Sequence, residues 1–188
     1  MTLITTPGDP NADSYAAIAD ADAYFLALGN MLWTATDAWK EAYLRRATRY
    51  LENQYRRRWI GIRATQAQSL AWPRVDGSRN LYYNAVAYPL LDIDGFQIPI
   101  TAVPAQVLKA TCELAFLVLS GATLEPRAGI GDQNIISESS QVDVLKKDIT
   151  YAGSKALLER YLAVEGLLRG LVTSTPGASA GTVPLVRG

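Results

Sequence analysis

The chain has 188 residues, with eighteen Lys and Arg residues balanced by eighteen Asp and Glu residues, no histidine and one cysteine. Without histidine, imidazole general bases, His-containing catalytic triads and HExxH zinc sites are excluded, and one cysteine cannot hold a structural zinc ion. The length suits one hydrophobic core, and the zero net charge excludes a strong overall field toward DNA or a membrane surface.

The first predicted helix runs through the alanine-rich segment 15–28, "YAAIADADAYFLAL". Asp13 or Ser14 can cap it, because a short side-chain oxygen accepts a hydrogen bond from the unpaired amides of a first helical turn. Gly29 supplies the stop, since glycine adopts the backbone conformation that ends helices. The small side chains of this helix favour close packing against a neighbour.

A second, longer helix is predicted to begin after Thr34 or Thr36 and to run to about Arg57. At about 100° per residue, one arc carries apolar and aromatic side chains, namely Tyr43, Ala47, Tyr50, Leu51 and Tyr55. The opposite arc carries Arg45, Arg49 and Arg56. Two of these arginines have a glutamate four residues earlier, a spacing that stabilises helices by a few tenths of a kcal/mol.

The segment 64–74, "ATQAQSLAWPR", predicts one short helix closed by Pro73, because the residue before a proline is pushed out of the α conformation. Residues 75–102 contain Gly, Asn, Asp and Pro with scattered aromatic residues. That composition predicts either a long ordered loop or a pair of short strands, and the sequence leaves both open.

A third helix is predicted after Pro104, which suits the first helical position, and ends at Gly121. It is apolar almost all round, as is typical of a helix at the centre of a domain. Partial alternation around 130–152 predicts a β-hairpin or an extended arm. A last helix is predicted within 155–172, and the tail 173–188 has too few apolar residues to fold alone.

These elements predict a mainly α protein, a small helical bundle around a buried central helix, with a β-hairpin or extended arm and a flexible C-terminal tail. The expected domain spans 1–172, and 173–188 forms a docking tail. No apolar run reaches the roughly 18 to 20 residues that span a bilayer, and the N-terminus lacks a basic leader. We therefore expect a protein that is made and kept in the cytoplasm, or that leaves it inside an assembly, with no membrane partner.

No group of residues predicts catalysis. Cys112 falls in the apolar third helix and is expected to be a buried, inert thiol. The segment 92–95, "DIDG", lacks the later ligands of a calcium loop and predicts a plain turn. We therefore expect a protein that is not an enzyme, with no catalytic residue, no metal and no cofactor.

Charge is distributed unevenly along the chain. The charged residues before Tyr43 are mostly acidic, namely Asp9, Asp13, Asp20, Asp22, Asp37 and Glu41, whereas the segment 45–63 holds seven arginines and one glutamate. Arginines with interleaved aromatic rings are typical of single-strand nucleic-acid binding. The tyrosines lie opposite the arginines on the predicted helix, which favours a solvated face or a contact between identical copies.

Four segments in order resemble a known family: "ADSYAAIADADAYF", then "KEAYLRRATRYLENQYRRRWIGIRATQAQSLAWPR", then "DGFQIP" with "VPAQVLKATCELA", and finally "LLRGLV". Together they resemble bacteriophage proteins labelled DnaT-like single-strand DNA-binding proteins, which look like the head-to-tail adaptor, or head-completion, proteins of tailed phages. The resemblance covers most of 13–119 and, more weakly, the last helix.

This resemblance implies a structural virion protein in the phage neck, made in the host cytoplasm. Its copies would form a dodecameric ring that joins the portal protein to a downstream tail-completion or stopper protein. DNA would pass through the ring with weak contact only. The portal-binding tail would comprise Thr182, Val183, Pro184, Leu185, Val186, Arg187 and Gly188.

The alternative hypothesis is a replication accessory protein that binds single-stranded DNA. The residues expected to contact either DNA or a neighbouring subunit are Arg45, Arg49, Arg56, Arg57, Arg58 and Trp59. A metabolic enzyme is the third, generic possibility.

Overall fold

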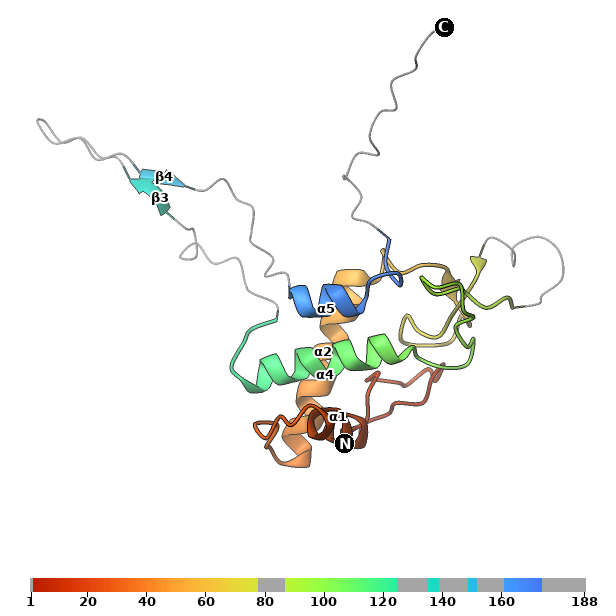
Figure 1. Ribbon diagram of the computed structural model, residues 1–188, viewed down its shortest axis with the longest axis horizontal. Helices are drawn as coiled ribbons and strands as arrows, with labels where there is room; N and C mark the ends of the chain where they lie inside the picture. The colour runs from red at the N-terminus through yellow and green to blue at the C-terminus, as the bar shows by residue number, and fades with distance from the viewer. Residues whose placement is uncertain (1, 78–86, 125–134, 139–148, 152–160, 174–188) are drawn as a thin grey trace, which may run out of the picture. The chain divides into compact units, whose positions relative to one another are not determined.

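The computed structural model describes residues 2–77, 87–124, 135–138, 149–151 and 161–173 (Figure 1). These residues form four helices and two short antiparallel ribbons, which confirms the predicted mainly helical fold class. The chain divides into two compact units, one from residues 1–124 and 163–188 and one from residues 125–162.

Helix α1 spans Ile18–Ala27 and begins later than predicted. Both expected caps are used elsewhere: Asp13 accepts a hydrogen bond of 2.8 Å from a backbone amide near the N-terminus, and the Ser14 hydroxyl donates to a backbone carbonyl at 2.8 Å. Asp20 instead accepts the amide of the residue that precedes the helix, at 3.0 Å. The helix ends at Ala27, and Gly29, the predicted stop, follows its C-cap residue with φ at +67°.

Helices α2 (Asp37–Tyr55) and α4 (Ala105–Leu119) pack against each other and form the centre of the larger unit (Figure 1). The prediction of α4 as the buried central helix is confirmed by its interior residues, which are Val107, Ala110, Thr111, Cys112, Leu114, Ala115 and Val118. The facing residues of α2 include Leu44, Ala47 and Leu51, all fully buried. Each such leucine contributes roughly 1.5–3 kcal/mol through burial.

The predicted short helix within 64–74 is wrong, because residues 64–73 form an irregular loop. Gln68 explains the difference. Its buried side chain accepts the Thr65 amide at 2.9 Å and donates to the carbonyls of Leu70 and Pro73 at 2.8 and 3.0 Å. A side chain that bonds to nearby backbone groups in this way competes with the helical hydrogen-bond pattern.

The loop closes on a small ribbon in which β1 (Ile62–Arg63) pairs antiparallel with β2 (Arg74–Val75). Arg74 is buried, and its guanidinium donates to the carbonyls of Ile60, Gly61 and Ala71. Burial lowers the pKa of Arg74 from its usual value. Three carbonyl acceptors offset the cost of removing this charge from water.

Within the segment 75–102, most of the described residues after β2 are irregular. An isolated bridge joins Leu91 to Gln97 across a turn in which Asp92 accepts the amides of Asp94 and Phe96 at 3.0 and 2.8 Å. The prediction of a plain turn at 92–95 is therefore confirmed.

Helix α5 spans Leu162–Leu167, and residues 155–160 of the predicted last helix lie outside the described residues. The chain after α5 is fixed to the end of α2, since Ile60 donates its amide to Leu171 at 3.1 Å and Thr173 donates to Arg58 at 2.7 Å. Residues 182–188, the predicted docking tail, lie outside the described part of the chain.

The second unit contains a hairpin of β3 (Ile135–Glu138) and β4 (Ile149–Tyr151). The strands are antiparallel, with Ile135 opposite Tyr151 and Glu138 opposite Ile149, and the register shifts between these two pairs. Of the two predicted alternatives for 130–152, the hairpin is the one observed.

Candidate nucleic-acid interface

Helix α2 carries a row of residues at alternating spacings of three and four, which places them on one face of a helix. The row consists of Trp39, Ala42, Arg46, Arg49, Asn53 and Arg56, and we call these six residues the basic stripe. All of them except the partly buried Ala42 are exposed. The stripe contains three arginines and no carboxylate, so it presents positive charge to solvent.

The other faces of α2 are covered by the rest of the unit. One face packs on α4, and a second contacts the segment that precedes α1. On that second face, Thr48 accepts the backbone amide of Tyr15 at 3.2 Å and Glu52 accepts the Tyr15 hydroxyl. The basic stripe is thus the face that remains accessible.

Arg45 lies beside the stripe but is bonded within the chain. Its Nε donates to Asp13 at 2.6 Å, and its terminal nitrogens lie 3.3 Å from Glu41. The hydrogen bond to Asp13 is the main cause that raises the pKa of Arg45. Because this guanidinium already holds two carboxylates, we do not assign it to a ligand.

Two acidic residues near the N-terminus also form hydrogen bonds within the chain. Asp13 is bonded to Arg45, and Asp22 accepts hydrogen bonds of 2.7 Å from both Lys40 and the Trp33 indole nitrogen. These carboxylates neutralise cations inside the folded chain. Asp13 and Asp22, two of the six acidic residues before Tyr43, thus have partners within the chain.

Of the predicted contact residues, Arg49 and Arg56 lie on the stripe and Arg57 is exposed directly after it. The Arg56 side chain is 59% exposed, at 3.9 Å from Glu52. Arg58 instead lies over the ring of Tyr55, 5.2 Å from its centroid, and donates to a backbone carbonyl. Arg49, Arg56 and Arg57 are thus exposed to solvent, whereas Arg58 contacts other parts of the folded chain.

Trp59 does not belong to an accessible site. It is only 4% exposed, and its ring centroid lies 5.7 Å from that of Tyr55 and 5.8 Å from that of Trp72. Three aromatic rings packed in this way form part of the core. A nucleobase cannot reach the Trp59 ring in this fold.

Two stripe residues were missed by the sequence reasoning. Trp39 is 58% exposed and stacks on Tyr43, with ring centroids 6.0 Å apart and an angle of 26° between the planes. Arg46 is exposed and has no ion-pair partner among the described residues. The signal was present in the spacing, since Arg46 follows Trp39 by seven residues, or two helical turns.

Cys112 is fully buried, as predicted, and burial raises the pKa of its thiol to about 12. A thiol with such a pKa is almost wholly protonated near neutral pH, so it is a poor nucleophile and metal ligand. Within the described ranges, no three His, Cys, Asp or Glu residues are grouped to hold a metal ion. Among the same residues, each helix is too short or too polar to span a bilayer.

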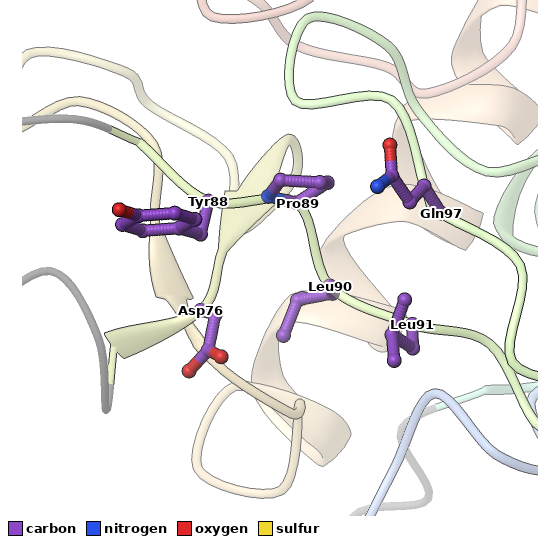
Figure 2. Close-up of a pocket in the computed structure, with 6 residues that line it drawn as sticks. All are labelled: Asp76, Tyr88, Pro89, Leu90, Leu91 and Gln97. Atoms are coloured by element: carbon purple, nitrogen blue, oxygen red, sulfur yellow. The ribbon is translucent and has the colours of Figure 1, made fainter.

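Figure 2 shows a surface hollow near the β2 strand, lined by Asp76, Tyr88, Pro89, Leu90, Leu91 and Gln97. Its lining includes Pro89, Leu90 and Leu91, and its one acidic side chain is Asp76. A carboxylate repels phosphate, so this hollow does not suit a nucleic-acid backbone. The basic stripe is the better candidate interface.

The fold and the stripe define a mainly helical protein with an exposed face of arginines and one tryptophan. A family model matches residues 1–188, and the chain belongs to that family, which is described as "Putative DnaT-like ssDNA binding protein". No curated protein and no solved structure matches the chain.

The expectation of a head-to-tail adaptor is wrong, because the family that matches the whole chain is described as a single-stranded DNA-binding family. The ring, the portal protein and the tail-completion partner are withdrawn with it. In the structure, two of the acidic residues expected to meet a neighbouring copy, Asp13 and Asp22, form ion pairs within the chain, with Arg45 and Lys40. The absence of catalysis and the location of the protein stay predictions.

Proposed function

We propose that the protein binds single-stranded DNA along the basic stripe of α2. The observation that carries this proposal is the exposure of Arg46, Arg49 and Arg56 on one helix face that has no carboxylate. The description of the matching family supports the same function. Arginine suits this role because its planar guanidinium bonds phosphate oxygens through two N–H groups at once.

The stripe has a length that matches several nucleotides. Ten residues separate Arg46 from Arg56, which corresponds to about 15 Å of helix axis at 1.5 Å per residue. Phosphates recur about every 3.4 Å along the axis for one strand in the B form, so the three arginines span a run of about four or five phosphates, of which each arginine can contact one.

The zero net charge of the chain is compatible with this binding, because the affinity for a phosphate depends on the charges close to it. Lys40 and Arg45 neutralise nearby carboxylates at 2.7 and 2.6 Å. The stripe arginines are exposed to solvent, and Arg56 lies 3.9 Å from Glu52. At an ionic strength of 0.15 M, screening limits electrostatic attraction to about 8 Å. Distant carboxylates therefore weaken the attraction of a bound phosphate only slightly.

A salt-dependent titration with a fluorescent oligothymidylate tests the proposal. We expect the variant that replaces Arg46, Arg49 and Arg56 by alanine to lose affinity, and the slope of log K against log salt to fall by about 2 in magnitude, since each single-strand phosphate contact contributes about 0.7. Lys109→Ala, at an exposed position of α4, is the matched control that removes one cation outside the stripe. Equal affinity and slope in all three proteins would reject the proposal.

A further inference from the structure

We propose that Trp39 stacks on an unpaired base of the bound strand and that Tyr43 holds the indole in position for this contact. The inference rests on the proposed function above and adds a base-binding site to it. The base would bind at the N-terminal end of the stripe, whereas the stripe arginines would bind the phosphates.

The exposure of Trp39 sets it apart from the other tryptophans of the chain. Trp33, Trp59 and Trp72 are 7%, 4% and 1% exposed, whereas Trp39 is 58% exposed. A large aromatic side chain gains free energy by burial, so the exposed indole offers apolar area that a stacked ligand would cover. The core does not require the Trp39 ring.

Tyr43 gives the exposed indole a fixed support. It lies one helical turn after Trp39, is partly buried, and its ring stacks on the indole with a centroid separation of 6.0 Å. This stacking restricts the rotation of the indole before a ligand arrives. A ring already ordered in this way loses less conformational entropy on binding.

The charge around Trp39 favours a nucleic acid over an apolar partner. Arg46 and Arg49 follow on the same face, and Arg46 lies two turns away, which is about 10 Å along the axis. A strand whose phosphates contact these arginines can place a base over the indole. Single-strand binders combine these two features, a basic track and an aromatic platform.

Stacking on Trp39 would also give preference for single strands over duplexes. In a duplex each base is already stacked between its neighbours and paired, so its face is not accessible to an indole. An unpaired base offers its face without that cost. Because every base has a π face, the contact would select single strands with little preference for sequence.

The experiment compares Trp39→Ala and Trp39→Phe with wild type by titration with oligothymidylate and with a duplex of equal length. We expect Trp39→Ala to weaken single-strand binding by about 5- to 150-fold, the range for loss of one base–aromatic stack. Its salt slope should stay as in wild type, because no phosphate contact is lost. Trp39→Phe should retain most of the affinity, and duplex affinity should be equal in all three proteins.

Leu32→Ala is the matched control, since Leu32 is an exposed apolar residue outside the stripe, at 73% exposure. Intrinsic fluorescence gives a second readout: the strand should quench wild type and should quench Trp39→Phe much less, because the other three tryptophans are buried. Unchanged single-strand affinity in Trp39→Ala, with loss of affinity in the arginine variant, would overturn the stacking inference and leave the proposed function standing. An equal loss in Leu32→Ala would also overturn it, by indicating a general apolar contact. Unchanged affinity in the arginine variant would reject the proposed function itself.

Discussion

Arg45 and Arg46 are neighbours in the sequence with opposite environments. The Arg45 Nε lies 2.6 Å from a carboxylate oxygen of Asp13, whereas Arg46 is exposed and has no ion-pair partner in the part of the chain that the structure describes. One arginine fixes the N-terminal segment to α2, and the next one presents its charge to solvent. The difference follows from one helical step of about 100°.

Alanine substitutions at these two positions should separate stability from binding. Arg45→Ala should lower the free energy of unfolding by about 0.5–1 kcal/mol, the range for a partly exposed ion pair. Arg46→Ala should change it by less than about 0.5 kcal/mol, as surface substitutions do, and should weaken binding to oligothymidylate. Urea denaturation and strand titration measure the two effects. The same stability loss in both variants would contradict the assignment.

The sequence predicted the long helices well, because each has a clear apolar period. The bounds of α2 and α4 agree with the predictions to within about two residues. The prediction of a helix was wrong at 64–73, where the composition favoured a helix. There the Gln68 side chain forms hydrogen bonds with nearby backbone groups, which compete with helical hydrogen bonds. The period of apolar residues cannot predict that one side chain will form hydrogen bonds with the backbone of its own loop.

The candidate site was predicted less well, for a physical reason. Periodicity sorts the residues of a helix into faces, but it does not say which face another segment covers. Arg45 donates a hydrogen bond to Asp13, which lies 32 residues earlier in the sequence. The Trp59 ring packs against Trp72, which lies 13 residues later. Only the fold shows that Trp59 is buried and that Trp39 is the exposed ring.

Trp59 should therefore act on stability and not directly on binding. Trp59→Ala should destabilise the protein by about 3–5 kcal/mol, since it removes a fully packed aromatic side chain. Trp59→Phe keeps a ring against Tyr55 and Trp72 and should cost less than half as much. Chemical denaturation of both variants checks this, and strand affinity of the folded Trp59→Phe protein should equal that of wild type. A stable Trp59→Ala protein that fails only in DNA binding would contradict the buried position.

Tyr15 and Glu52 form the second link between the N-terminal segment and α2. The Tyr15 hydroxyl donates to Glu52 and accepts the amide of Ala71 at 3.1 Å, while Glu52 accepts the same amide at 3.0 Å. Tyr15→Phe would remove the hydroxyl and leave the Glu52 carboxylate, whose side chain is 12% exposed, with one partner fewer. We expect a loss of about 1–3 kcal/mol by urea denaturation. Tyr88→Phe, at an exposed tyrosine, is the control and should change stability by less than about 0.5 kcal/mol.

Gly61 and Gly29 offer a matched pair, because both have positive φ angles of +65° and +67°. A Cβ at Gly29 would meet nothing within 4 Å, whereas one at Gly61 would collide with the Val75 carbonyl and lie 2.8 Å from Leu90. Gly29→Ala should cost about 1–2 kcal/mol from backbone conformation alone. Gly61→Ala should cost at least about 1 kcal/mol more, because backbone must also move. Thermal or urea denaturation of the two variants gives the difference, and equal losses would contradict the close approach at Gly61.

Cys112 should make stability fall in alkaline solution. The usual pKa of a cysteine thiol is 9.0, and burial raises the pKa of Cys112 to about 12 in the folded chain. Above pH 9 the unfolded chain loses this proton while the folded chain keeps it, so ionisation stabilises the unfolded state. The loss should reach about 1.4 kcal/mol at pH 10 and continue to about pH 12. Burial and hydrogen bonding to carboxylates also raise the pKa of Tyr15 and Tyr24, but from 10.0, so they add little below pH 10.

Cys112→Ala isolates this contribution. The variant should be less stable than wild type at pH 8 by about 1 kcal/mol, because a small group is removed from a packed core. Since alanine does not ionise, the gap should narrow between pH 8 and pH 10 and close or reverse near pH 10. Urea denaturation at several pH values measures the gap. If it stayed constant over that range, the thiol would be exposed to solvent or would ionise equally in both states, which would contradict its place inside α4.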